Sequence, residues 1–388
     1  MSSSKSTLNS QQSSFEKIQM VDVRSQYLKI KEEVDAAIHE VIDSCMFING
    51  PAVKRFQASL ETYLGVEYVV PCANGTDALQ LAMMAVGLKP GDEVILPAFT
   101  YVATAEVVAL LGLTPVMIDV DPQTFCITAE AVKEAITPKT RAVVPVNLYG
   151  QTAELEGIRQ LADTHGFYMI EDNAQAIGSD VTLSDGTVKK SGTIGHIGCT
   201  SFYPSKNLGA YGDAGAIYTD DADLAKRLRM AANHGQQRTY KHDTVGCNSR
   251  LDSIQAAVLD VKLKHLDRYA SARQLVADHY DLAFINTEAL DTPSRIVNGS
   301  HVFHQYTLKV TNGKRDALKE YLAEQGIPSM IYYPIPLYKQ EAYRELTTVT
   351  SLPHTEHLCE RVISLPMHTE MPMEQIKYIT KAVNSFLA

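Results

Sequence analysis

The sequence predicts an α/β protein with a mainly parallel sheet in a large domain, followed by a smaller C-terminal α+β domain. Short apolar runs alternate with helical stretches between residues 68 and 171, which is the rhythm of βαβ units. The hydrophobic fraction of 45% and the charged fraction of 21% are ordinary for a globular protein. A length of 388 residues suggests more than one structural unit.

The predicted strands are apolar runs without polar alternation, as expected for strands buried on both faces. They cover residues 68–71, 93–96, 115–118, 142–146 and 168–171. Ahead of them, residues 15–50 predict a short extended piece and an amphipathic helix. A second helix is predicted over residues 52–64, after the break at Gly50-Pro51.

The pattern changes near residue 250. Apolar residues at helical spacing predict one long helix over residues 253–284. A strand-like run at 303–310, a helix at 315–325 and an apolar tract at 331–337 follow. We therefore divide the chain into three parts. They are a disordered tail of polar composition at 1–14, a large domain at 15–250, and the long helix with the small domain at 251–388.

Composition excludes several classes of protein. The formal net charge of −10 argues against a nucleic-acid partner, which needs a concentrated basic face. The chain contains no run of about 18 apolar residues, so no membrane span is expected. The six cysteines are scattered without a C-x-x-C pair, and the histidines lack ligand spacing. No metal site is expected, and a reducing cytoplasm fits best.

The segment Asn74-Gly75-Thr76-Asp77 follows a predicted strand and precedes a helical run. A helix N-terminus offers unpaired backbone N–H groups and a positive dipole end to a phosphate. Gly75 permits close approach, and Thr76 adds a hydroxyl donor. The alternative is an ordinary N-cap, which such residues usually form.

Asp172 lies at the carboxyl end of the predicted strand 168–171. In doubly wound sheets, ligands collect outside the carboxyl ends of the strands, so this carboxylate is placed to meet one. It can pair with a protonated ring nitrogen and make the ring an electron sink. The alternative is that Asp172 caps the following helix, and position alone does not decide between them.

Lys206 lies in the segment Ser201 through Gly209, among small residues and next to a turn. A lysine in a partly desolvated pocket has a lowered pKa, which frees its amine to form an imine. The alternative is a surface lysine on a turn. For an isolated lysine, this alternative is the stronger interpretation.

Together these segments resemble the successive signatures of the nucleotide-sugar aminotransferases of the DegT/DnrJ/EryC1/StrS family. The motifs are Gly75-Thr76-Asp77-Ala78-Leu79, Pro97 through Thr104, Glu171-Asp172-Asn173-Ala174-Gln175, Ser201 through Gly209 and Asn248-Ser249-Arg250-Leu251-Asp252. They stand in family order from about residue 18 to the end. The resemblance implies the fold type I of aspartate aminotransferase, with pyridoxal 5'-phosphate (PLP) as cofactor.

The resemblance implies a role for individual residues. Lys206 resembles the Schiff-base lysine and catalytic residue, and Asp172 the partner of the ring nitrogen. The other cofactor contacts that it implies are Gln175 near the phenolic oxygen, Gly75, Thr76 and Ser201 at the phosphate, Asn248 reaching the phosphate from a neighbouring subunit, and Tyr101 stacked on the ring. Phe99 is the alternative to Tyr101. A homodimer with shared active sites follows.

The resemblance also bears on the substrates. Asn248-Ser249-Arg250 is typical of members that aminate C3 of the sugar, so a 3-keto acceptor is favoured. We expect L-glutamate as donor and UDP-2-acetamido-2-deoxy-3-oxo-glucuronate as acceptor, in surface-polysaccharide (O-antigen) biosynthesis. Arg250 can grip a carboxylate through two parallel N–H bonds. The alternative is that Arg250 caps the preceding loop or pairs with Asp252. The other substrate-binding candidates are His242, Tyr332 and Tyr333.

One departure and three alternatives limit this reading. Relatives have a His-Tyr pair where this chain has Tyr332-Tyr333, so Tyr332 departs from the family pattern. The alternatives are a dTDP-3-keto-6-deoxy sugar as acceptor, amination at C4, and a PLP-binding regulatory or sensor protein without turnover. His234, His242 and His304 could also be structural histidines, and His242 is the strongest candidate for a function among them.

Overall fold

The computed structural model describes residues 17–387, and the tail predicted to be disordered, residues 1–14, lies outside them. The centre of the molecule is a seven-stranded sheet in the order β1-β9-β8-β5-β4-β2-β3. Its strands are β1 (Tyr68–Cys72), β2 (Glu93–Pro97), β3 (Thr114–Ile118), β4 (Thr140–Val143), β5 (Tyr168–Asp172), β8 (Ile197–Ser201) and β9 (Gly215–Thr219). Only β9 is antiparallel to its neighbours within this sheet, so the prediction of a mainly parallel sheet is confirmed.

Two strands of this sheet, β8 and β9, were not predicted, and the prediction for one other strand was too long. Gly198, the second residue of β8, breaks the apolar pattern, yet it has a packing role. A Cβ on Gly198 would lie 2.2 Å from Cε2 of Tyr218, its cross-strand partner on β9. The run predicted as residues 142–146 ends as β4 at Val143, because Pro145 has no N–H to donate to a ladder.

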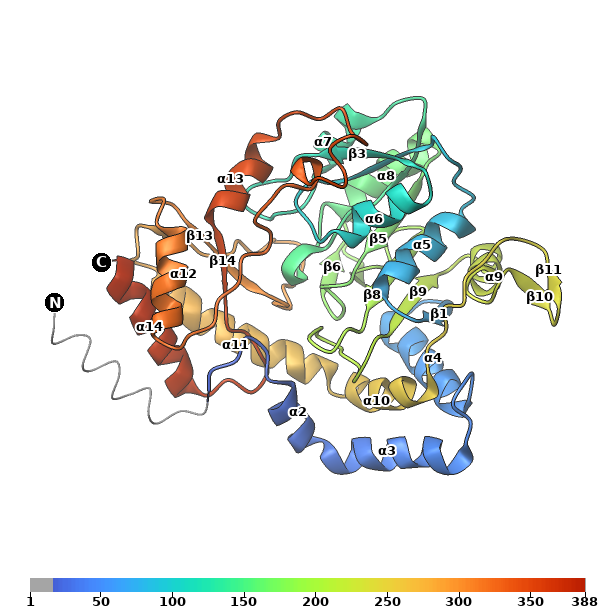
Figure 1. Ribbon diagram of the computed structural model, residues 1–388, viewed down its shortest axis with the longest axis horizontal. Coiled ribbons are helices and arrows are strands. Elements are labelled where there is room, and N and C mark those ends of the chain that lie inside the picture. Colours follow the sequence, from blue (N-terminus) through green and yellow to red (C-terminus); the bar gives the residue numbers. More distant parts are fainter. Residues whose placement is uncertain (1–16, 388) are drawn as a thin grey trace.

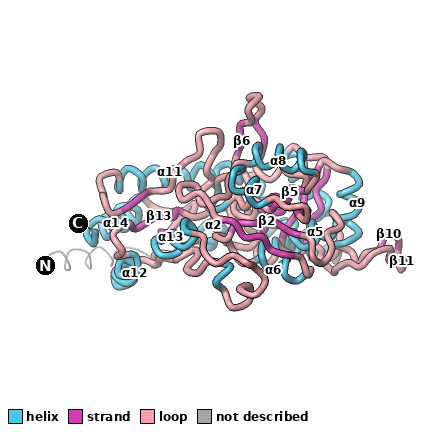
Figure 2. Tube along the Cα trace, turned by 90° about the horizontal axis from the view of Figure 1, so that it is seen from above, coloured by secondary structure: helices cyan, strands magenta, loops and turns pink. Residues whose placement is uncertain are grey.

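Helices cover both faces of this sheet (Figures 1 and 2). On one face lie α5 (Gly75–Ala85), α6 (Ala103–Leu110) and α9 (Ala222–Ala231). On the other lie α7 (Ala129–Ala135), α8 (Leu155–His165), α4 (Pro51–Leu64) and α10 (Ser253–Leu263). Strand β2 shows both contacts, since Val94 and Leu96 enter the first core and Ile95 enters the second. This two-sided burial explains the continuous apolar runs.

The helices outside the sheet differ from prediction in their breaks. The predicted amphipathic helix near the N-terminus is two helices, α2 (Val23–Lys29) and α3 (Lys31–Ser44). The single long helix predicted over residues 253–284 is wrong, because α10 ends at Leu263 and α11 (Leu266–Phe284) starts after a turn. The two halves pack into different cores: Leu263 joins that of α4, and Val276 joins that of the C-terminal sheet.

The C-terminal part contains a small antiparallel sheet, β12 (Leu290–Asp291), β13 (Tyr306–Val310) and β14 (Val362–Leu365). Helices α11, α12 (Arg315–Glu324) and α14 (Met373–Leu387) pack on its core, and α13 (Pro353–Arg361) precedes β14. Short 3-10 turns lie at η1 (Leu148–Gly150) and η2 (Leu337–Lys339). The division of the chain at residue 250 stays a prediction.

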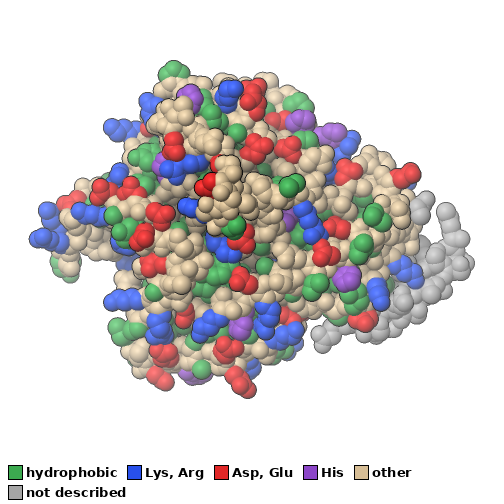
Figure 3. Space-filling model, turned by 180° about the vertical axis from the view of Figure 1, so that it is seen from behind, with side chains coloured by type: hydrophobic (Ala, Val, Ile, Leu, Met, Phe, Trp, Pro, Cys, Tyr) green, Lys and Arg blue, Asp and Glu red, His purple; other side chains and the backbone are tan. Residues whose placement is uncertain are grey.

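Two hairpins project from this body. They are β6 (Asp180–Thr182) with β7 (Val188–Lys190), and β10 (Gln236–Arg238) with β11 (Lys241–His242). Figure 3 shows the second hairpin standing out from the molecule, with basic side chains on it. Its tip is solvent-exposed, since Tyr240 is 92% exposed. In the described part of the chain, every helix is too short or too polar to span a bilayer.

Candidate active site

A cavity of about 730 Å³ opens at the carboxyl ends of the parallel strands β2, β4, β5 and β8. Its wall combines segments that are far apart in the sequence. The lining residues used below are Gly75, Thr76, Thr100, Tyr101, Tyr149, Asp172, Gln175, Ser201, Lys206, His304, Tyr332 and Tyr333. The cavity therefore lies where the topology of a doubly wound sheet concentrates ligands.

Asp172 is the last residue of β5 and is 7% exposed. Its carboxylate accepts hydrogen bonds from the hydroxyl of Thr104, at 2.9 Å, and from the backbone N–H of Ala174, at 3.2 Å. Burial raises the pKa of the Asp172 carboxyl, while these two donors and the charge of Lys206 act in the opposite direction. The side chain is thus fixed in a site of low polarity, where its charge acts strongly on a neighbour.

Lys206 lies on the loop between β8 and β9, and its amine reaches the same cavity. The backbone N–H of Lys206 donates to the carbonyl of Tyr203 at 2.8 Å, which closes a tight turn. Burial lowers the pKa of Lys206 to about 8, and the opposing influence is the negative charge of Asp172. The neutral, nucleophilic fraction of the amine near neutral pH is therefore much larger than for an ordinary lysine.

The N-terminus of α5 forms one side of the cavity. Asn74 caps the helix, since its side chain accepts from the N–H of Asp77 at 2.8 Å. Gly75 and Thr76 occupy the first helical positions, whose N–H groups have no intrahelical acceptor. A Cβ on Gly75 would lie only 2.6 Å from Cβ of Ser201. The N-cap and the open first turn are both present. The segment can therefore cap the helix and still offer free N–H groups to a phosphate.

Aromatic residues and an amide form another part of the wall. Gln175 accepts from the N–H of Tyr149 at 2.7 Å and donates to the hydroxyl of Tyr333 at 3.2 Å. The Tyr149 hydroxyl donates to the carbonyl of Tyr332. Tyr101 lines the cavity and is 56% exposed, with its ring 6.3 Å from that of Tyr333. By contrast, Phe99 is buried against Phe125 outside the lining.

Three candidate residues lie outside the cavity lining of their own chain. Asn248 is exposed and pairs with Asn233, next to the projecting β10–β11 hairpin. His242 is on that hairpin, with its ring nitrogen Nδ1 2.8 Å from the carbonyl of His234. Arg250 is half-buried and follows Ser249, whose hydroxyl accepts from the N–H of Ala73 at 3.1 Å.

The structure also gives a place at the site to His304 and Thr104, for which the sequence predicted no contact in the cavity. His304 lines the wall, whereas His242 does not. Burial, together with the charges of Lys206 and Arg273, lowers the pKa of His304 well below its ordinary value, so this imidazole is neutral. Thr104 contacts Asp172 directly. Thr104 could have been found, because it ends the motif Pro97 through Thr104. His304 appeared in the sequence only as one of three possible structural histidines, and no motif placed it at the site.

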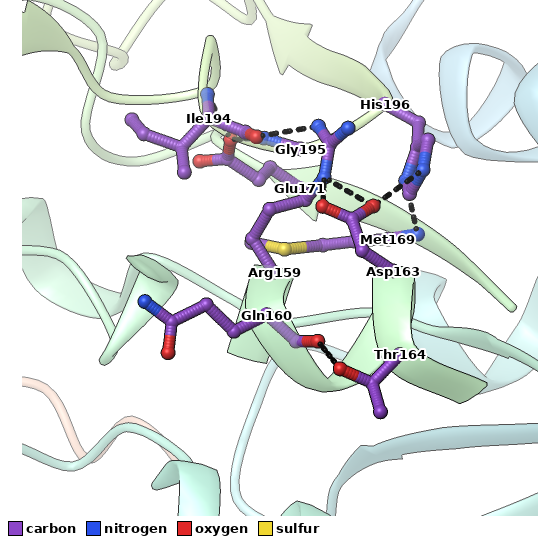
Figure 4. A network of polar contacts seen from close by, with 9 residues as sticks. All are labelled: Arg159, Gln160, Asp163, Thr164, Met169, Glu171, Ile194, Gly195 and His196. Carbon is purple, nitrogen blue, oxygen red and sulfur yellow. Dashed lines mark hydrogen bonds and ion pairs between the residues drawn. The ribbon is translucent and has the colours of Figure 1, made fainter. Parts of the chain in front are cut away.

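Glu171, which precedes Asp172 on β5, lies in a polar network together with Arg159 and Asp163 (Figure 4). Glu171 is buried and accepts from the N–H groups of Gly192, Ile194 and Gly195. Arg159 of α8 donates to Asp163 and to the carbonyl of Ile194. Neighbouring acids on one strand thus point to opposite faces, and Glu171 fixes the strand end that carries Asp172.

A buried carboxylate, a lysine with a lowered pKa and an open helix N-terminus in one cavity are typical of an enzyme that binds a phosphorylated ring cofactor. The chain belongs to the DegT/DnrJ/EryC1/StrS aminotransferase family, whose sequence profile matches residues 28–384. The protein is therefore an aminotransferase, and the predicted fold type I is confirmed. Aminotransferases of this family depend on PLP.

Known relatives match along nearly the whole chain. The UDP-2-acetamido-2-deoxy-3-oxo-D-glucuronate aminotransferase of Pseudomonas aeruginosa is 43% identical over 95% of this chain and 100% of its own length. The UDP-N-acetyl-3-dehydro-alpha-D-glucosamine 3-aminotransferase of Acidithiobacillus ferrooxidans is 43% identical over 95% of this chain and 98% of its own. Among solved structures, DesV of S. venezuelae superposes with a TM-score of 0.91 at 37% identity, covering 96% of this chain and 99% of that one.

The cavity wall fits PLP chemically. The cofactor has a phosphate, a ring with a basic nitrogen and an aldehyde that a lysine amine attacks. The wall supplies a helix N-terminus, the carboxylate of Asp172 and the amine of Lys206. In addition, Thr100 Oγ1 and His304 Nδ1 are buried without a hydrogen-bond partner among the described residues. Such groups cost free energy unless a ligand or water meets them.

Proposed function

We propose that this chain transfers the amino group of L-glutamate to C3 of a nucleotide-linked 3-keto-sugar, with UDP-2-acetamido-2-deoxy-3-oxo-glucuronate as the acceptor. The observation that carries the proposal is the single cavity that joins Lys206, Asp172 and the N-terminus of α5. The two relatives at 43% identity, both named as acting on 3-oxo or 3-dehydro UDP-sugars, support the choice of acceptor.

In this proposal each cavity residue has one task toward the cofactor. Asp172 holds a proton on the ring nitrogen, and Gln175 contacts the phenolic oxygen. The phosphate is bound by Gly75, Thr76 and Ser201. Tyr101 stacks on the ring, which its exposed position on the wall supports. The cofactor supplies an electron sink for the electron pair released at the reacting carbon.

Lys206 carries the proton in both half-reactions. With the cofactor and glutamate bound, its amine would remove the proton from Cα of the donor. In the second half-reaction the same amine delivers a proton to C3 of the sugar. One base serves both substrates because both react on the same face of the site. The lowered pKa of Lys206 supports this role, since a base works best when its pKa is close to the working pH.

The substrate contacts of the proposal involve two subunits. Asn248 reaches the phosphate of a neighbour's cofactor, and Arg250 grips a substrate carboxylate. His242 completes the sugar site from the projecting hairpin, while Tyr332 and Tyr333 contact the substrate from the wall. The position of Asn248 and His242 away from their own cavity supports a homodimer with shared active sites.

We place this activity in the cytoplasm, in the biosynthesis of a surface polysaccharide. All six cysteines of the chain are free thiols, which supports a reducing compartment. Burial raises the pKa of the Cys72 and Cys199 thiols, so these two are unreactive packing residues.

An acceptor panel tests the proposal. Glutamate alone should bleach the visible band of the PLP-loaded enzyme, which a sensor protein without turnover would not show. With the UDP-3-keto-uronate, kcat/KM should exceed that for a dTDP-3-keto-6-deoxy sugar by about tenfold or more, because the uronate adds a charged hydrogen bond to arginine. Faster amination of the 6-deoxy sugar, or of a 4-keto sugar, would replace our acceptor. An Arg250→Gln variant should lose the preference for the uronate.

Replacing Gly75 by alanine should weaken PLP binding. The new methyl group would lie 2.6 Å from Cβ of Ser201, at the proposed phosphate site. Overpacking of this kind costs about 1–3 kcal/mol, which corresponds to about fivefold to 150-fold in affinity. The measurement is fluorescence titration of the apoenzyme with PLP.

The control for that substitution is Gly87→Ala, just beyond the C-terminal end of the same helix. Gly87 has a φ of +78° and open space around its Cα, so alanine strains the backbone without reaching the cavity. Equal PLP affinity in wild type and Gly75→Ala would contradict the proposal that the phosphate binds at this turn.

A further inference from the structure

Lys262 on α10 is a buried lysine whose amine meets a backbone carbonyl. The residue is 1% exposed, and its Nζ donates to the carbonyl oxygen of Gly209 at 2.5 Å. The same Nζ lies 5.2 Å from the centroid of the Tyr211 ring. Helix α10 packs against α3 and α4 and lies below the sheet in Figure 1.

The burial of this lysine is not offset by an acid. Among the residues that the structure describes, Lys262 forms no ion pair, and the charge that acts on it is that of Arg273. Burial, followed by that positive charge, lowers the pKa of Lys262 to about 7. Both the ammonium and the neutral amine carry an N–H for Gly209. A leucine or methionine would fill this space at lower cost, since an unpaired buried charge is expensive.

The carbonyl that Lys262 holds belongs to the loop that carries Lys206. This loop is folded tightly on itself: a Cβ on Gly209 would lie 2.4 Å from the carbonyl oxygen of Pro204. The N–H of Lys206 bonds to Tyr203, and the N–H of Ala210 bonds to Phe202 at 2.7 Å. A displacement of Gly209 is therefore transmitted to Lys206 through a short, closed piece of chain.

Two further side chains hold the same loop. Gln255, also on α10, accepts from the N–H of Tyr211 at 2.8 Å. Asn207 donates to the carbonyl of Val302 at 3.0 Å and so joins the loop to the segment that carries His304. Arg273 on α11 holds that second segment in the way Lys262 holds the first, by donating to the carbonyl of Phe303 at 3.1 Å.

We propose that Lys262 is a positioning residue for Lys206: its hydrogen bond to Gly209 sets where the Lys206 loop sits over the cavity. Gln255 supports it from the preceding part of α10. The inference rests on the proposed role of Lys206. Nothing in it requires Lys262 to contact substrate or cofactor, and its effect comes through the backbone of residues 206–209.

Lys262→Met tests the inference, since methionine has a similar length and no donor. The PLP-loaded variant should lose about tenfold to hundredfold in kcat, because a small misplacement of a reacting group has effects of this size. Its KM for glutamate should change less than about threefold. Amide hydrogen exchange of peptides covering residues 203–211 should be faster than in wild type. Exchange in α5 and β5 should not change.

Lys264→Met is the matched control, because Lys264 is two positions away and exposed. It should match wild type in kcat and in exchange. Lys262→Gln, which keeps a shorter donor, should recover part of both. If Lys262→Met does not fold, the inference is tested with Lys262→Gln and Gln255→Leu. The measurements are again kcat and the amide hydrogen exchange of peptides covering residues 203–211.

The inference would be overturned if a folded Lys262→Met enzyme had the same kcat and the same hydrogen exchange as wild type. The same result in both Lys262→Gln and Gln255→Leu would also overturn it. Failure of the proposed function is distinguishable from this result. In that case wild type itself would show no amination of the sugars, whereas the exchange comparison does not depend on turnover.

Discussion

Lys206→Ala should abolish transamination. We expect kcat to fall by more than about 10³-fold, since a general acid–base group alone contributes about 10²- to 10⁴-fold and the covalent attachment point is lost as well. The variant should still bind PLP through the phosphate turn at Gly75 and through Asp172, which Lys206 does not hold in place. Single-turnover mixing with glutamate, followed at the visible band, measures this loss.

The pH dependence of cofactor attachment checks the same assignment in wild type. Because the pKa of Lys206 is lowered to about 8, the neutral fraction of the amine grows with pH and levels off above that value. The rate at which the apoenzyme captures PLP, trapped by borohydride and located by peptide mass, should follow this curve. Exposed Lys189 provides the control variant, Lys189→Ala, which should match wild type. Near-normal turnover of Lys206→Ala would reject the assignment.

Asp172→Asn should have the second largest effect, with kcat lowered about 10²- to 10³-fold, the usual size for loss of one preorganised electrostatic contact. Asparagine keeps the shape and can still accept from Thr104, so the fold is retained. Without the negative charge, however, a ring nitrogen would not stay protonated and the electron sink is weakened. The measurement is kcat for both half-reactions.

Asp185→Asn is the control, because Asp185 is exposed on the β6–β7 hairpin. PLP affinity separates two causes of a loss. A large drop in kcat with little change in affinity identifies an electronic role, whereas equal losses in both would mean that Asp172 only builds the site. Activity of Asp172→Asn within about threefold of wild type would exclude the pairing with the ring nitrogen.

Much of the fold could be predicted because its strands are buried on both faces. Runs such as Val94-Ile95-Leu96 are apolar throughout, since each neighbour enters a different core. Strand β8 was not predicted because Gly198 interrupts its apolar pattern. This glycine makes room for the ring of Tyr218 on the neighbouring strand, which the local sequence does not show. The break between α10 and α11 was not predicted for a similar reason. Apolar residues continue at helical spacing through both helices, and this spacing does not reveal that the two helices pack into different cores.

The site was predictable to the extent that its residues follow strands. Asp172, Lys206 and Gly75 meet because β5, β8 and β1 run in the same direction, so that their carboxyl ends lie at one edge of the sheet. His304 arrives from another part of the chain, and its place depends on close backbone packing. A Cβ on Gly150 would lie 2.8 Å from the backbone nitrogen of Phe303 and 2.9 Å from that of His304. The local sequence around His304 does not reveal this contact.

The reversed direction of β9 has a consequence for how the chain can vary. Parallel neighbours require a crossover helix between them, whereas β8 and β9 are joined directly. The Lys206 segment is thus free to cross the strand ends instead of covering a face. Its two ends are pinned where Ser201 pairs with Gly215, beside Asn74 and Gly75. Lengthening the segment by one residue would leave the sheet intact and still shift the amine, so its length is under tighter constraint than that of the outer hairpins.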